Sequence, residues 1–279
     1  MTEVHGGRFG VVNNIAAVRD WAINDEGTLA AFRNSATANG MGRRAGVLAW
    51  NGSYQAHGAV PAVLPAAFFS FLGYTAPDND TLGGTGETYA GNAIVDAVNI
   101  NWDWAGGQII NHAVNFSGNL GLTATPTDTA ISDSSWNDPE STNGTVIKYS
   151  PDGTTWTTLG NLTQASLGIN ASNPSFVNSS TAGLTGRRAG PIDWSLQLSI
   201  ESNLNGSGLV KGTSYQWRLY TTATLFYLLK WGRVKGFSGL NVNRETGTII
   251  AHSIQVEMDA TVGGVAGSIL MPGGASYWP

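Results

Sequence analysis

Residues Ala93–Trp104 read AIVDAVNINWDW. Bulky apolar side chains dominate the even positions, and the odd positions from Asn99 onward are polar. The even positions hold Ile94, Asp96, Val98, Ile100, Trp102 and Trp104, and the polar odd ones are Asn99, Asn101 and Asp103. A period of two is typical of a β-strand that buries one face. This segment therefore predicts a long strand with one polar face.

A second strand is predicted directly after the first. Gly106–Gly107 is a tight-turn signal, and Gln108–Ser117 places Ile110, Val114 and Phe116 on one face. The two segments predict a β-hairpin. Three more segments show strand patterns: Ala67–Tyr74, Val146–Thr158 and Gln216–Tyr220. Helical patterns are few, and the best of them is Asn14–Phe32, which Asp25–Gly27 interrupts. Because strand patterns dominate, the fold is predicted to be mainly antiparallel β with little helix.

A twenty-residue segment occurs twice in the chain. Ala31–Trp50 reads AFRNSATANGMGRRAGVLAW, and Ser175–Trp194, 144 positions later, reads SFVNSSTAGLTGRRAGPIDW. Eleven of the twenty positions are identical, including both arginine pairs and the closing tryptophans. A period of this length is the size of a small domain rather than of a solenoid repeat. The chain is therefore predicted to hold two copies of one fold.

The 279 residues suit two β-sandwich or barrel domains in tandem. Thr125–Asn143 is rich in Ser, Thr, Asp and Pro, as a domain boundary usually is. We therefore predict a first domain over residues 1–126, a linker over 127–142 and a second domain over 143–279.

The second copy also contains an alternating segment. Thr248–Asp259 reads TIIAHSIQVEMD, and at an offset of 156 residues it aligns with the predicted strand of the first copy. This alignment pairs Asp96 with His252 and assigns about twelve additional residues of the second copy to the region around Tyr215–Trp231. It also predicts two equivalent polar faces: Asn99, Asn101 and Asp103 in one copy, and Gln255, Glu257 and Asp259 in the other. Repeated in a ring, such faces would line a channel with a mildly negative wall, which repels DNA phosphates. The alternative is that each is an ordinary solvated face of a sheet.

Composition excludes several classes of protein. There is no cysteine, so disulfides and thiolate metal sites are excluded, and none of the four histidines lies at metal-ligand spacing from another. A net charge of −5 argues against nucleic-acid binding. Charged residues make up 12% of the chain against a typical ~25%, which favours burial of the surface against other copies. Without a signal-peptide pattern or a membrane-spanning apolar run, a cytoplasmic origin is expected.

No catalytic motif is present, and neither an enzyme activity nor a cofactor is predicted. Asp96 and His252 could form an acid–base pair across an interface, but local hydrogen bonds are the more common role of such groups. The arginine pairs Arg43–Arg44 and Arg187–Arg188 could contact phosphate, but their recurrence favours a structural or interface role. Trp50 and Trp194 are interpreted as core or interface residues.

The pattern of strands and glycines resembles the tail tube proteins of long-tailed bacteriophages. The resemblance extends over most of both halves and rests on these segments: Val60–Pro65, Phe68–Thr75, Tyr89–Val95 leading into the hairpin, Phe116–Asn119, Lys211–Tyr215 and Gly247–Asp259. The resemblance implies β-sandwich domains whose hairpins join between subunits into a barrel lumen. It also implies six domains in each ring, and members with two domains per chain form trimeric rings of pseudo-sixfold symmetry.

The resemblance predicts a structural, non-enzymatic virion protein, made in the host cytoplasm, whose homotrimers stack into a tail tube. The partners implied are further copies of the chain, the tape measure, tail terminator and baseplate or initiator proteins, and viral DNA that passes through without specific binding or a membrane. Lumen-facing positions would be Asn99, Asn101, Asp103, Gln255, Glu257 and Asp259. Subunit or ring contacts would come from Arg43, Arg44, Trp50, Arg187, Arg188 and Trp194. The alternatives are a capsid decoration or fibre-attachment protein, and a two-domain β hydrolase that acts on glycans.

Overall fold

The computed structural model describes residues 18–33, 41–61, 63–74, 86–107, 109–127, 141–202, 207–241, 251–262 and 269–272. As expected, this part of the chain is mainly antiparallel β. The strands of the first half are β1 (Val18–Phe32), β2 (Gly42–His57), β3 (Phe68–Tyr74), β4 (Gly86–Asp103) and β5 (Ile110–Thr127). Those of the second half are β6 (Ile147–Ser150), β7 (Thr157–Leu159), β8 (Leu162–Ala171), β9 (Ser175–Phe176), β10 (Gly186–Arg187), β11 (Ile192–Ile200), β12 (Ser214–Tyr220), β13 (Phe226–Asn241), β14 (Ala251–Met258) and β15 (Ile269–Leu270). One 3-10 turn, η2, spans Ser179–Thr181.

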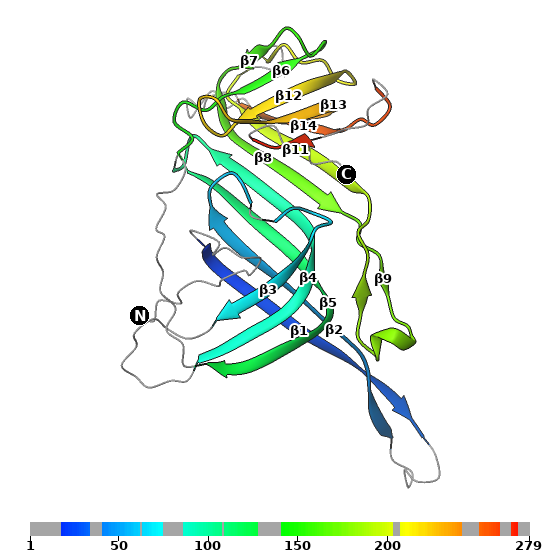
Figure 1. The fold of residues 1–279 in the computed structure, drawn as a ribbon. Helices are drawn as coiled ribbons and strands as arrows, with labels where there is room; N and C mark the ends of the chain where they lie inside the picture. Colours follow the sequence, from blue (N-terminus) through cyan, green and yellow to red (C-terminus); the bar gives the residue numbers. More distant parts are fainter. Residues whose placement is uncertain are drawn as a thin grey trace.

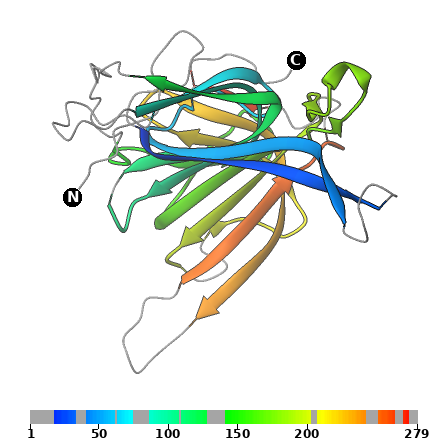
Figure 2. The ribbon, with the colours of Figure 1, turned by 90° about the horizontal axis from the view of Figure 1, so that it is seen from below.

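Thirteen strands form one sheet in the order β1-β2-β5-β4-β8-β11-β14-β13-β12-β6-β7, with β3 and β15 attached to β4 and β13. The strands of the two halves therefore occupy separate parts of the sheet and meet where β4 pairs with β8 (Figure 1). Figure 2 shows the same strands fanning out from β1 and β2, in blue, to β14 and β13, in orange. The predicted linker falls largely outside the described residues, and the predicted domain limits stay a prediction.

The predicted hairpin of the first half is confirmed as β4 and β5, which pair from Trp102↔Ile110 back to Gly86↔Thr127. A β-bulge between Val95 and Ala97 divides β4 into two parts. The part before the bulge pairs with β3, and the part from Ala97 to Asp103 pairs with β8. Because a bulge bends its strand, β4 can serve two neighbours on the same edge.

The segment with the best helical pattern, Asn14–Phe32, is not a helix over its described residues, where Val18–Phe32 forms strand β1. Trp21 and Ile23 alternate with the exposed Asp20, Ala22 and Asn24 and pack against the core, and the whole segment pairs with β2. A helical spacing of a few apolar residues is only a local preference. Pairing with β2 outweighs it, because each strand of a sheet supplies backbone hydrogen bonds to the next.

The pairing registers extend the internal repeat well beyond twenty residues. Trp50 lies opposite Asp25 and Trp194 lies opposite Ile169, so β1–β2 and β8–β11 share one register at an offset of 144. The remaining strands correspond as β3 to β12, β4 to β13, and β5 to β14 followed by β15. Even the bulge recurs, between Val234 and Gly236 of β13.

The predicted alignment at an offset of 156 is therefore wrong. β14 corresponds to β5 rather than to β4, and the counterpart of His252 is His112 instead of Asp96. Both histidines lie opposite the equivalent residue of the preceding strand, Ala56 for His112 and Ile200 for His252. The second copy has a shorter connection between its third and fourth strands, from Tyr220 to Phe226 instead of from Tyr74 to Gly86. The extra twelve residues inferred near Tyr215–Trp231 do not exist.

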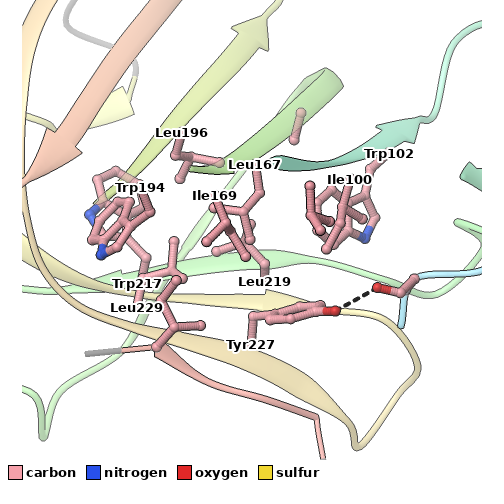
Figure 3. Close-up of a cluster of buried hydrophobic side chains, with 14 of the residues drawn as sticks. Ile100, Trp102, Leu167, Ile169, Trp194, Leu196, Trp217, Leu219, Tyr227 and Leu229 are labelled. Atoms are coloured by element: carbon pink, nitrogen blue, oxygen red, sulfur yellow. Dashed lines mark hydrogen bonds between the residues drawn. The ribbon is translucent and has the colours of Figure 1, made fainter. Parts of the chain in front are cut away.

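Apolar side chains from both halves form one hydrophobic cluster. Figure 3 shows Trp102 and Ile100 of the first half beside Leu167, Ile169 and the core of the second. Two hydrogen bonds link the halves within this core: Trp102 Nε1 donates to the Tyr220 carbonyl at 3.2 Å, and the Tyr227 hydroxyl donates to the Ala59 carbonyl at 2.6 Å. The junction between the copies is therefore packed like a domain interior.

Candidate assembly surface

The face of the sheet opposite the core is polar over at least six neighbouring strands. Strand alternation places Asn101 opposite Ser166, Ser166 opposite Gln197, and Gln197 opposite Gln255. We call this surface the polar face, and its members on the described strands include Ser53, Gln55, Asn99, Asn101, Asp103, Asn111, Asn115, Gln164, Ser166, Asn170, Ser195, Gln197, Ser199, Ser253, Gln255 and Glu257. Five of the six predicted lumen positions thus belong to one continuous surface.

Two shallow hollows lie on the polar face. One is lined by Asn101, Asp103, Asn111, Gln164, Ser166, Gln197 and Ser199 together with Trp102 and Ala165, where strands of the two halves meet. The other is lined by residues of the first half, including Asn24, Asn51, Ser53, Asp96 and Asn115. Amide and hydroxyl groups dominate both hollows, so the surface can exchange hydrogen bonds with water but holds few fixed charges.

Asp259 differs from the other predicted lumen positions. It follows β14, and only 6% of its side chain is exposed. Ser214 and Thr261 donate hydrogen bonds to its carboxylate, and Arg233 forms an ion pair with it at 2.8 Å. These bonds, from Ser214 first, hold the pKa of Asp259 well below its usual range. Asp259 therefore fastens β12 and β13 to the end of β14 instead of presenting a free charge.

The second half of the polar face also carries cations that the sequence alignment did not place there. Arg233 lies opposite Glu257 in the pairing of β13 with β14, and the Lys235 ammonium contacts the Glu257 carboxylate at 2.5 Å. Both of these cations are compensated by carboxylates, Asp259 for Arg233 and Glu257 for Lys235. The polar face thus remains close to neutral with an acidic excess from residues such as Asp103.

Sequence analysis missed the contribution of β8 and β11 to the polar face. Leu162–Ala171 reads LTQASLGINA, in which Gln164, Ser166 and Asn170 alternate with the buried Ala165, Leu167 and Ile169. The alternation was present in the sequence, but glycine and serine weakened its contrast.

The arginine pairs of the internal repeat lie on two hairpin arms. In the first copy, the arm is the far end of the β1–β2 hairpin, and Arg43 and Arg44 pair with Ala31 and Ala30 on it. In the second copy, Arg187 and Arg188 lie on the segment that contains β9 and β10, and the Arg188 guanidinium stacks over the Phe176 ring at 5.3 Å. Trp50 and Trp194, interpreted from the sequence as core or interface residues, are buried in the chain's own core.

Within the chain, Asp96 and His252 have separate hydrogen-bond partners and do not contact each other. Asp96 accepts hydrogen bonds from Ser117 and Asn173, and His252 Nδ1 donates to the Ser202 carbonyl at 2.9 Å. Each group thus has its own local partners, as the structural interpretation expected. Among the described residues, no group of three histidine and carboxylate side chains could hold a metal ion.

Within the described ranges, no helix has the length and apolar character needed to cross a membrane. No protein-family model matches the sequence, and a search of the curated proteins also finds no match.

Proposed function

We propose that this chain is the major tail tube subunit of a long-tailed bacteriophage, a non-enzymatic virion protein that forms stacked trimeric, pseudo-hexameric rings around a channel for genome ejection. The observation that carries the proposal is the pairing of β4 with β8, which joins the two copies edge to edge. The same type of junction can be repeated between chains. It needs one strand edge equivalent to that of β4 and one equivalent to that of β8, and each chain has both without a described partner strand.

The first of these edges is the outer edge of β13 after its bulge. The Val234 N–H donates to the Thr213 carbonyl, as the Val95 N–H donates to the Ala67 carbonyl. The pairing on this side of β13 and of β4 therefore ends at equivalent residues. Beyond that point, Ala97–Asp103 of β4 pair with β8, whereas no described strand pairs with Gly236–Leu240 on this side. Strand edges of this type are templates for pairing with another chain.

The second edge belongs to β1, the counterpart of β8, which among the described strands pairs only with β2. Ala97 lies opposite Asn170 within the chain. Applying the offsets of 139 and 144 residues to this pair predicts that Gly236 of one chain lies opposite Glu26 of the next. By the same rule, Phe237 lies opposite Asp25, and Ser238 lies opposite Asn24. Each new junction would extend the polar face from chain to chain.

Identical head-to-tail contacts either close into a ring or form an open filament, and we propose that in this protein they close. Three chains contribute six copies, and the polar faces would then line the channel. On the described strands the two cations of the polar face, Arg233 and Lys235, are paired with carboxylates. A wall of amides and hydroxyls with an acidic excess therefore offers DNA phosphates little cationic charge to bind.

The experiment is electron microscopy of the purified protein with native mass spectrometry, supported by one designed cross-link. The chain contains no cysteine, so Glu26→Cys with Gly236→Cys gives a defined disulfide between chains. Ala97→Cys with Asn170→Cys is the matched control and should link within one chain. We expect stacked rings and a covalent trimer for the first pair only.

Two results would overturn the proposal. One is a protein that stays monomeric even with a tail initiator complex. The other is a fixed trimer that never stacks, which would point to a decoration or fibre-attachment protein instead.

A further inference from the structure

The two hairpin arms have the same internal pairing but different surroundings. Phe32↔Gly42 and Ala31↔Arg43 in the first arm correspond to Phe176↔Gly186 and Ser175↔Arg187 in the second at an offset of 144. We call residues 28–33 with 41–47 the first arm, and residues 172–191 the second arm. In Figure 1, the first arm projects from the body at the far end of β1 and β2, while the second runs beside the sheet at β9.

The second arm is docked on the first copy of its own chain. β2 and β5 pair only as far as Asn51↔Ser117, and the second arm enters the gap where they diverge. On one side, Leu48 donates to the Gly183 carbonyl and Thr185 donates to the Leu48 carbonyl, both at 3.0 Å. On the other side, Leu120 donates to the Thr185 carbonyl at 2.8 Å.

Two side chains complete this contact. The Asn119 side chain accepts from the Arg187 backbone at 2.8 Å. Asn173 Nδ2 donates to the Val95 carbonyl at 2.8 Å and to Asp96 at 2.9 Å, at the bulge of β4. Docking therefore uses the backbone of β2, the bend of β5 and the bulge of β4.

Burial differs between the arms at equivalent positions. Thr185 is 7% exposed in the docked arm, whereas its counterpart Met41 is 57% exposed in the first arm. Leu29, the counterpart of Asn173, is 62% exposed. Two large apolar side chains thus lie on a projecting arm that the described part of the chain does not cover, which is typical of a contact surface.

The second copy contains the surface on which an arm of this kind would dock. β11 and β14 pair as far as Ser195↔Glu257, the same place at which β2 and β5 diverge in the first copy. Ile192 holds the position of Leu48, and Lys235, at the bulge of β13, holds the position of Asp96. Asp259 stands where Asn119 does in the first copy, at the end of β14.

We infer that the first arm of each chain docks on the second copy of the neighbouring chain, beside Ile192 of β11 and Lys235 of β13, as the second arm docks within its own chain. The neighbour is the chain whose β13 edge pairs with β1, so this inference rests on the proposed ring. The twenty-residue repeat is then one docking element used twice, once within a chain and once between chains.

The changed residues fit this exchange of surfaces. The polar pair Asn173–Asp96 becomes Leu29 beside Lys235, whose carbon stem offers apolar contact while its ammonium stays on Glu257. Met41 replaces Thr185 at the backbone contact, where a flexible thioether side chain can fill an irregular gap.

The test uses a second cysteine pair in the assembled protein. Leu29→Cys with Lys235→Cys should cross-link neighbouring chains into covalent trimers under oxidation or with a short bismaleimide. Asn173→Cys with Asp96→Cys is the matched control, because the same contact lies within one chain and should give a linked monomer. Each single variant should form at most dimers.

The outcomes separate this inference from the proposed function. If Glu26→Cys/Gly236→Cys gives covalent trimers and tubes form, but Leu29→Cys/Lys235→Cys gives no trimer, the arm docks elsewhere and the inference is wrong. If neither pair links chains and no ring forms, the proposed function is wrong, and the arm contact is wrong with it. Trimers from both pairs support both.

Discussion

His112 and His252 hold the same position in the two copies and make the same hydrogen bond. Nδ1 of His112 donates to the Gly58 carbonyl at 2.8 Å, and Nδ1 of His252 donates to the Ser202 carbonyl at 2.9 Å. Gly58 and Ser202 are themselves 144 residues apart. In both imidazole rings, the Nε2 atom is buried without a hydrogen-bond partner in the described structure. The duplication thus extends to buried polar contacts outside the twenty-residue repeat.

The first prediction concerns the pH dependence of stability. Burial lowers the pKa of His112, and the bond to Gly58 opposes this shift only in part. The folded state therefore binds the proton less readily than the unfolded state. The contribution of the neutral His112 ring to the free energy of unfolding is complete above the ordinary histidine pKa of about 6.5. It declines as pH falls from that value toward the pKa of the folded state, by up to about 1.4 kcal/mol per pH unit.

Urea unfolding at pH 7.5 and 5.5 checks this prediction. His112→Gln should be less stable than the wild type at pH 7.5, because it alters a buried hydrogen bond, yet it should lose less stability on acidification. An equal loss in both proteins would show that other groups carry the acid sensitivity.

The second prediction uses two glycines of β13. A Cβ on Gly232 would lie 2.3 Å from the Trp194 ring and 2.7 Å from Val256, whereas a Cβ on Gly236 would meet nothing within 4 Å. Gly232→Ala should therefore destabilise the chain by about 1–3 kcal/mol through overpacking. Gly236→Ala should change stability by less than about 1 kcal/mol. Guanidinium unfolding of the two variants gives the comparison, and equal effects would contradict the packing of Trp194 against this strand.

Strand alternation was sufficient to predict the mainly β fold and the β4–β5 hairpin, since Val98, Ile100 and Trp102 bury the face that the sequence indicated. The correspondence between copies was harder to predict. The segment around His252 resembles both β4 and β5 of the first copy in its alternation, and only the pairing of β14 with β11 distinguishes them. Which strands are neighbours depends on contacts between distant segments, and no local pattern contains that information.

The candidate site shows the same limit. Asn99, Asn101, Asp103, Gln255 and Glu257 were predicted to lie on two equivalent polar faces, and they lie on the polar face of one sheet. Asp259 continues the alternation of β14 in the sequence, but the strand ends at Met258 and the carboxylate turns to Ser214, Thr261 and Arg233. Its partners come from segments that the sequence pattern did not bring together.

The third prediction follows from those partners. Hydrogen bonds from Ser214 and Thr261 and the Arg233 ion pair lower the pKa of Asp259, so its contribution to stability is full above its ordinary pKa of about 4 and is lost as pH falls below that value. Asp259→Asn should be less stable than the wild type at pH 7, and the difference should narrow toward pH 2. Asp193→Asn, at an exposed position, is the control. A constant difference from pH 7 to pH 2 would mean that the charge of Asp259 contributes nothing.

The fourth prediction concerns the polar face as the wall of the channel. Three lysines can be added to one row of this face by Asn101→Lys, Gln197→Lys and Gln255→Lys. The core should not change, because these side chains are on the other face of the sheet from the buried residues of their strands. In a trimeric ring they add nine, and cationic side chains create affinity for the phosphate backbone. Tubes of this variant should form normally and retain DNA in a salt-dependent way, and phage carrying it should eject DNA more slowly.

The control for that variant places three lysines at exposed loop positions: Thr155→Lys, Thr222→Lys and Thr224→Lys. It has the same net charge, so a general electrostatic effect would slow ejection equally in both. Slower ejection in the polar-face variant alone is expected if the face lines the channel. Normal ejection with normal tubes would mean that the polar face points outward and that another surface surrounds the DNA.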